Sequence, residues 1–185
     1  MSVDNFLASD LYRYSNLKWS VKNCLIGLLI PGFRFTFFFR KVSNPNTVPI
    51  FRWFYRFIHK WLEFKYGFQI PSKTQIGKGL YIGHHGTIII NEKAILGDNC
   101  NIAPGVVIGQ SNRGLRKGTP VIGNKVWIGV NSVIVGSISI GDNVLVAPCS
   151  YVNVDVPSNS IVIGNPAKIV SKEDATEGYI TNVIN

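Results

Sequence analysis

The segment IGNKVWIGVNSVIVGSISIGDNVLV, residues 122–146, repeats an aliphatic residue at every sixth position. Counted outward in both directions, the same spacing holds between residues 70 and 152, apart from two interruptions. The aliphatic positions that fit it are Ile70, Ile76, Ile82, Ile90, Leu96, Ile102, Ile108, Ile122, Ile128, Ile134, Ile140, Val146 and Val152. A period of six matches neither an α-helix nor an ordinary alternating strand, and it is typical of hexapeptide β-helices.

We therefore predict a mainly β fold, a left-handed parallel β-helix over residues 69–170, in which three short strands and eighteen residues make one triangular coil. The position four residues after each aliphatic one is mostly small or β-branched, as at Ala94, with Leu80 the bulkier exception. Glycines such as Gly77 and Gly97 are expected at the corners, with the positive φ that they tolerate.

Two insertions interrupt the repeat, one of two residues within 82–90 and one of eight within 108–122. Regular coils cannot absorb such insertions, so the chain must bulge or loop outward there. The first contains His84 and His85 between glycines, which would place two imidazoles on an exposed corner. Neutral histidine accepts a proton near physiological pH, so these two are candidate general bases, and ordinary surface histidines are the alternative.

A metal site is not expected from the cysteines and histidines. Zinc needs about three histidine ligands in a β-helix site of this kind, whereas the chain has only His59 besides the neighbouring pair, which cannot easily face one ion. The cysteines lack a Cys-x-x-Cys spacing, so we interpret them as buried thiols. They are Cys24, Cys100 and Cys149.

Residues 1–68 differ from the rest, because they hold ten basic and three acidic side chains and so carry +7 of the total charge of +9. The basic residues are interleaved with Phe and Trp, a mixture that suits a membrane interface better than nucleic acid. The uncharged run between Lys22 and Arg34 is too short to span a bilayer. A secretory signal is not expected either, so we predict a cytoplasmic protein, peripheral at the inner face of the membrane.

An amphipathic helix is predicted within this N-terminal part. Ile50, Phe54, Phe57, Trp61 and Leu62 recur at three- and four-residue intervals, and basic residues follow another stripe. Two roles remain open for its apolar face. It either packs on the body of the protein or contacts an anionic membrane surface.

The segments IGKGLYIGHHGTI (76–88), LGDN (96–99) and GNPAKIV (164–170) resemble the serine acetyltransferase group of hexapeptide acyltransferases. The resemblance covers residues 69–170. It implies a homotrimer that binds acetyl-CoA as co-substrate between adjacent β-helices. It also implies that His84 deprotonates an acceptor hydroxyl for direct attack on the thioester.

Departures from that group bear on the acceptor. The group has an aspartate that orients the catalytic histidine, and Gln69 stands at that position here. Gly83 replaces an acidic residue that precedes the histidine, and Gly118-Thr119 lie near the position of an Arg-His pair. Glu92 matches a glutamate of the acceptor pocket. Because the groups that pair an amino acid are mostly missing, the sequence favours the branch that O-acetylates a sugar hydroxyl in capsule, exopolysaccharide or O-antigen biosynthesis.

Serine acetyltransferase, amino-sugar N-acetyltransferase and a non-catalytic trimeric scaffold at the membrane are the alternatives. The predicted acceptor is a saccharide or a lipid-linked glycan. Its candidate contacts are Asn91, Glu92 and Arg113. The candidate acetyl-CoA contacts, by the same resemblance, are Gly129, Val130, Pro148, Asn153 and Lys168. Residues 171–185 are assigned to a C-terminal tail, and Trp127 is expected to pack on the outside of the coil.

Overall fold

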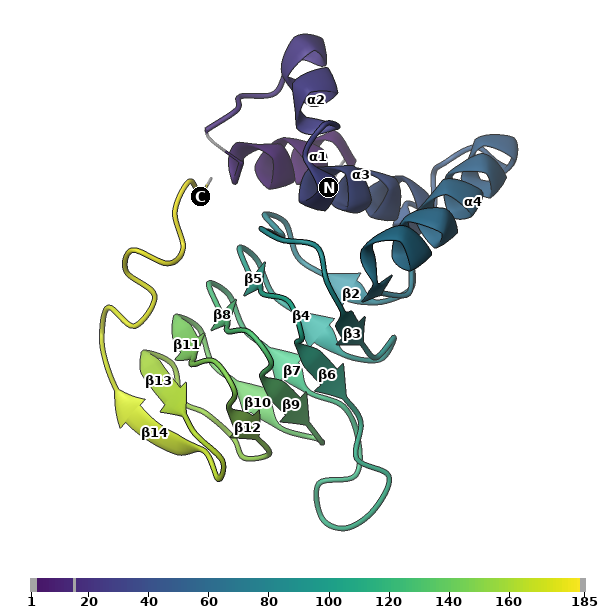
Figure 1. Ribbon diagram of the computed structural model, residues 1–185. Coiled ribbons are helices and arrows are strands. Elements are labelled where there is room, and N and C mark those ends of the chain that lie inside the picture. Colours follow the sequence, from purple (N-terminus) through teal and green to yellow (C-terminus); the bar gives the residue numbers. More distant parts are fainter. Residues whose placement is uncertain (1–2, 15, 184–185) are drawn as a thin grey trace.

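The computed structural model describes residues 3–14 and 16–183, and it contains an N-terminal helical part followed by a three-sided β-helix (Figure 1). The helices are α1 (Val3–Tyr12), α2 (Val21–Gly27), α3 (Pro31–Ser43) and α4 (Pro49–Tyr66). The strands are β1 (Phe68–Gln69), β2 (Gln75–Ile76), β3 (Ile88–Ile90), β4 (Ile95–Leu96), β5 (Asn101–Ile102), β6 (Val107–Gly109), β7 (Val121–Ile122), β8 (Trp127–Ile128), β9 (Val133–Val135), β10 (Ser139–Ile140), β11 (Val144–Val146), β12 (Tyr151–Val152), β13 (Ser160–Ile163) and β14 (Lys168–Ser171).

Successive strands of the β-helix belong to different sheets. Sheet A has the order β1-β3-β6-β9-β12, sheet B the order β10-β7-β4-β2, and sheet C the order β14-β13-β11-β8-β5. Pairing is parallel throughout except between β13 and β14. Trp127 pairs with Leu145, the residue eighteen positions later, so the predicted coil length is confirmed. The arrangement is consistent with the expected left-handed β-helix.

The aliphatic repeat positions form the core of the prism. All of them are buried, with Ile76 the most exposed at 7%. The positions four residues later are also buried, apart from the half-buried Gly86. Each of the three sides of a coil therefore contributes two small or branched side chains to the core. Burial of one Ile or Val stabilises the fold by about 1.5–3 kcal/mol.

The expectation of positive φ at the repeat glycines is wrong. Positive φ occurs instead at Asn99, Lys125, Asn131, Asn143, Cys149 and Asn159 and at glycines outside the repeat. The repeat glycines stack in a column where successive coils approach closely. A Cβ on Gly97 would lie 2.7 Å from the carbonyl carbon of Gly123, and one on Gly123 would lie 2.8 Å from that of Gly141. Glycine is needed there for space rather than for its dihedral freedom.

The helices α1 and α3 close the open end of the prism. Phe35 and Phe39 continue its core. The buried guanidinium of Arg40 pairs with Asp10 (2.8 Å) and donates to the carbonyl of Ile76, at the first coil. Arg13 is also buried, so two of the ten basic residues counted above cap backbone carbonyls and do not charge the surface. Terminal coils of solenoids need such caps, because their last backbone groups have no further coil to bond.

Three other expectations concern single segments. Among the described residues no helix alone is long and apolar enough to cross a membrane, and α2 and α3 meet that criterion only together, across a bend of 116°. Cys100 is buried, Cys24 is half-buried and Cys149 is exposed, so the prediction of buried thiols is wrong for Cys149. Trp127 packs outside the coil as predicted, against the ring of Tyr179 (4.8 Å between centroids).

Candidate active site

The corner that carries His84 and His85 is anchored by hydrogen bonds on both sides while both imidazoles are exposed. Before the corner, the hydroxyl of Tyr14 donates to the carbonyl oxygen of Ile82 (3.2 Å) and accepts from its amide (3.0 Å). Burial raises the pKa of Tyr14, which keeps this hydroxyl protonated. Within the corner, the Gly86 amide donates to the carbonyl oxygen at the end of α4, that of Tyr66 (3.0 Å). The backbone is therefore hydrogen-bonded on both sides of the two histidines.

This corner is the first of a stack that we call the histidine edge, made of residues 83–87, 103–106, 129–132 and 147–150, where sheet C passes to sheet A. Backbone hydrogen bonds join its levels. The Asn131 amide donates to the Pro104 carbonyl oxygen (3.0 Å), and the Cys149 amide donates to that of Val130 (2.9 Å). The predicted positions Gly129, Val130 and Pro148 thus lie on the same edge as the histidines.

Lys168 lies at the foot of the histidine edge. It is exposed at the start of β14, directly after the turn that follows β13. That turn is bonded to the lowest coil, because the Gly164 amide donates to Ser150 Oγ (3.1 Å) and its carbonyl oxygen accepts from the Tyr151 amide (3.1 Å). The ammonium group of Lys168 therefore lies at the end of the histidine edge, which consists mainly of small residues and prolines.

The other predicted contacts share a different edge. We call it the loop edge, made of residues 91–94, 110–120, 136–138 and 153–155, where sheet A passes to sheet B. It includes Asn91, Glu92, Arg113 and Asn153. Asn91 Nδ2 donates to Oε1 of Gln110 in the loop (3.4 Å). Within one chain, sheet A separates these residues from the histidine edge, so the structure does not bring the two groups together.

The long insertion at 110–120 is a loop that projects outward between β6 and β7 (Figure 1). Its base is fixed by the Ser111–Gly118 bridge, and Arg116 pairs with Asp155 (2.6 Å). That bond lowers the pKa of the Asp155 carboxyl, which is also bonded to the Ser139 amide. Thr119 Oγ1 donates to the Lys93 carbonyl oxygen (3.1 Å). Arg113 remains exposed at the tip of the loop.

The outer face of sheet A lies between the two edges. Gln69 pairs with Ile89, and the same register continues through Val107 and Val133 to Tyr151. Gln69 is exposed and the four others are half-buried, so an apolar row runs down this face. Gln69 supplies no carboxylate to orient an imidazole. The described residues contain no group of three or more His, Cys, Asp or Glu side chains placed to hold a metal ion.

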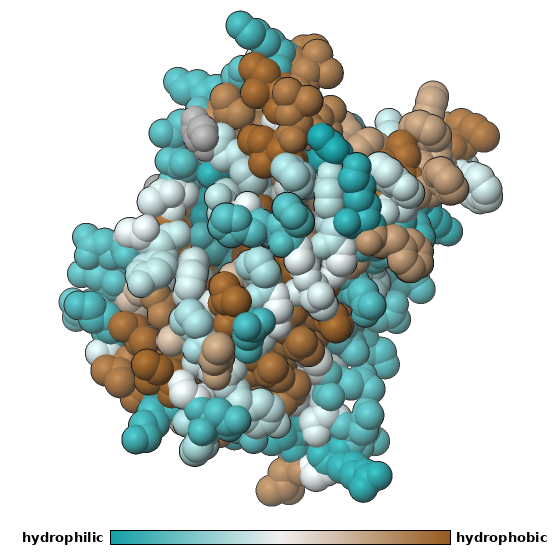
Figure 2. Space-filling model, in the orientation of Figure 1, coloured by the Kyte–Doolittle hydropathy of each residue, from teal (hydrophilic) through white to brown (hydrophobic). Residues whose placement is uncertain are grey.

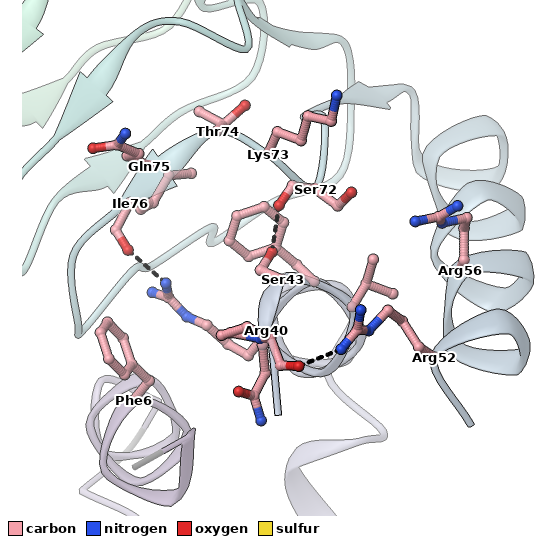
Figure 3. A pocket seen from close by; sticks show the side chains of 14 residues that line it. Phe6, Arg40, Ser43, Arg52, Arg56, Ser72, Lys73, Thr74, Gln75 and Ile76 are labelled. Atoms are coloured by element: carbon pink, nitrogen blue, oxygen red, sulfur yellow. Dashed lines mark hydrogen bonds between the residues drawn. The ribbon is translucent and has the colours of Figure 1, made fainter. Parts of the chain in front are cut away.

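A cavity of about 530 Å³ lies beside the loop edge, one coil toward the helices (Figure 3). It is lined by α3, the start of α4 and residues 72–76. The end of that segment forms β2, which pairs with β4, the strand that follows Asn91–Lys93 of the loop edge. Figure 3 shows Arg56 projecting from α4 toward this segment, which carries Lys73, whereas the Arg52 guanidinium donates to the carbonyl oxygens of Pro45 and Thr47 between α3 and α4. None of the described residues that line the cavity carries a carboxylate. No linear motif joins these cations, so the sequence did not reveal the cavity.

The fold and the histidine edge define a transferase built from hexapeptide repeats, and the comparisons with known proteins agree. Residues 119–153 match the family model described as bacterial transferase hexapeptide (six repeats). Serine acetyltransferase of Helicobacter pylori (strain ATCC 700392 / 26695) is 30% identical over 156 residues, which cover 84% of this chain and 88% of the relative. The chain belongs to the hexapeptide-repeat acyltransferase family.

Two further matches give the extent of the similarity. Serine acetyltransferase 4 of Arabidopsis thaliana is 35% identical over 129 residues, and this chain spans only 36% of its length. A crystal structure of Neisseria gonorrhoeae serine acetyltransferase in complex with serine has a TM-score of 0.72 and 30% identity, over 91% of this chain and 69% of that one. The relatives thus carry the name of the serine alternative, and not of the polysaccharide branch that the sequence favoured.

Proposed function

We propose that this protein is an acetyl-CoA-dependent O-acetyltransferase with His84 as its general base. The observation that carries the proposal is the anchored corner of two exposed imidazoles at the first level of a continuous edge of small residues, in a chain whose relatives are serine acetyltransferases. Gly129 and Val130 offer a surface for the extended pantetheine arm, and Lys168 suits a CoA phosphate.

The chemistry needs one base. The neutral His84 imidazole takes the proton of the acceptor hydroxyl as its oxygen bonds to the thioester carbonyl carbon, which gives a tetrahedral intermediate. That intermediate collapses with cleavage of the carbon–sulfur bond, and the imidazolium returns the proton to the leaving CoA thiolate. A positioned base of this kind contributes about 10²–10⁴-fold to the rate.

We also propose a homotrimer. Its support is the separation of the histidine edge from the loop edge, on either side of the apolar row of sheet A. If sheet A packs against a neighbouring subunit, the loop edge of one chain meets the histidine edge of the next, and a closed ring of such contacts completes each site. Light scattering should give about three times the 20.5 kDa of one chain. A monomer mass would contradict the proposal.

L-Serine is the first candidate acceptor, because the relatives are named for it and the gonococcal structure contains it. A specific observation favours a saccharide hydroxyl as the second. The positions Gly83, Gly118 and Thr119 present no charge for an amino acid, whereas Arg52, Arg56 and Lys73 line a cavity next to the loop edge. Arg40 also lines the cavity but is paired with Asp10. The other three cations meet no carboxylate among the described lining residues, which suits the phosphate of an activated or lipid-linked sugar.

The test is release of free CoA thiol from acetyl-CoA, followed with a thiol reagent, in the presence of serine or of a panel of sugars, sugar phosphates and nucleotide sugars. Mass spectrometry then identifies the acetylated product. Stimulation by serine alone selects the first acceptor, and stimulation by phosphorylated sugars alone selects the second. If no hydroxyl acceptor stimulates thiol release while acetyl-CoA still binds, the scaffold alternative replaces the enzyme. An acetylated amine would instead select the N-acetyltransferase.

We propose a cytoplasmic location for this activity. The three cysteines are all free, which suits a reducing compartment.

A further inference from the structure

The solvent-facing side of α4 is almost wholly apolar. Six large side chains on it are between 51% and 79% exposed. They are Ile50, Trp53, Phe54, Phe57, Trp61 and Phe64, and we call them the aromatic stripe. Their spacing of three and four residues places them on one face of the helix. A monomeric soluble protein rarely exposes so continuous an apolar surface, so something covers this one.

The body of the protein does not cover it, because α4 already packs through its opposite face. Leu62, His59 and Tyr66 are buried there. Leu62 and Tyr66 belong to the same core as Phe35, and the His59 ring lies 5.0 Å from that of Phe35. The sequence left two roles open for the apolar face of this helix. Leu62 packs on the body of the protein, whereas the aromatic stripe does not.

Cations border the aromatic stripe on both sides. Lys60 Nζ lies 5.2 Å from the ring centroid of Phe64, and Lys65 Nζ lies 4.6 Å from that of Trp61. Arg56 is exposed on the same flank as Lys60. Within residues 49–66, all of them described, the one carboxylate is Glu63, which is buried and paired with Lys60 (2.8 Å). The rim of the stripe is therefore positive.

A second apolar patch lies at the same end of the molecule. Val21, Leu25 and Leu29, in and just after α2, are more than 60% exposed. Figure 2 shows hydrophobic residues gathered over α2 and along α4, at the end opposite the last coils of the β-helix. Both patches belong to the helical part that caps the prism, and neither contributes to the histidine edge.

We propose that α4 lies flat on an anionic lipid surface, with the aromatic stripe in the headgroup region and α2 as a second contact. Trp and Phe flanked by Lys are the composition of interfacial helices. The eighteen residues of α4 give about 27 Å of helix, long enough to lie along a membrane. Lys60 is paired with Glu63, but association of two stripes would bring Arg56 and Lys65 of both copies together with no carboxylate of residues 49–66 left to neutralise them, so charge favours an anionic partner.

The experiment is flotation of the full chain on a density gradient with vesicles of phosphatidylcholine alone or with one quarter phosphatidylglycerol. We expect the protein to float with the anionic vesicles, and to bind the neutral ones at least about tenfold less. Binding should weaken as salt is raised from 0.1 M to 1 M, because the Debye length falls from about 10 Å to about 3 Å.

Two matched pairs of variants localise the contact. Phe57→Glu with Trp61→Glu should abolish flotation, whereas Leu115→Glu, at a fully exposed leucine of the 110–120 loop, should leave it unchanged. Arg56→Gln with Lys65→Gln should weaken binding to anionic vesicles, and Lys117→Gln should not. Circular dichroism confirms that each variant is folded.

Three results would overturn the inference. The full chain could fail to float with anionic vesicles. The Phe57→Glu/Trp61→Glu variant could float as well as the unchanged protein. The same variant could lower the mass of the assembly by light scattering, which would make the stripe a contact between copies of this chain.

Discussion

Mixing two inactive variants tests whether each active site is shared between subunits. One variant carries His84→Ala on the histidine edge. The other carries Asn91→Ala, Glu92→Ala and Arg113→Ala on the loop edge. All four side chains project from corners or from the outer loop and are exposed or half-buried. Each substitution should therefore change the free energy of unfolding by less than about 0.5 kcal/mol.

The expected recovery follows from the separation of the two edges within one chain. A shared site needs His84 from one subunit and the loop edge from its neighbour. In a cyclic trimer that contains both variants, in either ratio, only one of the three subunit contacts joins an intact His84 to an intact loop edge, so about one third of the unmutated activity should return in such complexes. If one chain supplied both edges, every site would still contain one defect, and no activity would return.

The assay is thiol release from acetyl-CoA by complexes that carry both of two affinity tags, obtained by coexpression or by joint refolding. Two differently tagged copies of the His84→Ala variant form the control, which should stay inactive. Full inactivity of the mixed complexes would refute the shared site. Full activity of the loop-edge variant alone would show that Asn91, Glu92 and Arg113 do not belong to the site.

Three further predictions concern single positions. His84→Ala should lower kcat by about 10²-fold or more with acetyl-CoA binding unchanged, and a larger loss in His85→Ala, measured in the same assay, would reverse the assignment within the pair. Burial lowers the pKa of His59 from 6.5 to about 4, so the unfolded chain takes up this proton first and stability should fall as the pH drops from 6.5 toward 4. His59→Phe should remove up to about 3 kcal/mol of that loss in urea unfolding followed at both pH values, and an unchanged pH dependence would show that another group causes it. Ile128→Ala, at a fully buried core position, should cost about 2–5 kcal/mol of unfolding free energy, and a much smaller loss in the same measurement would mean that the coils can collapse around the missing side chain.

The β-helix could be predicted from the sequence because its coil is local. Each inward side chain is followed by the next at a constant spacing, so Ile122, Ile128 and Ile134 reveal the period before any long-range contact is known. The insertions that break this period also marked the histidine corner and the outer loop. The role of the repeat glycines could not be predicted in the same way. Gly97 and Gly123 are needed because two successive coils, separated by the long insertion in the chain, approach each other there.

What only the tertiary structure decided concerns surfaces made by distant segments. Arg13 and Arg40 have the same chemistry as Arg56, yet folding buries the first two against the carbonyls of the first coils and leaves the third exposed. Leu62 and Phe57 belong to one apolar pattern, but only Leu62 meets the core formed by α3. A periodic pattern predicts which residues form the apolar face of a helix. Because a neighbouring element can cover only the part of that face that it touches, the pattern alone does not predict which apolar residues stay exposed and can contact a partner.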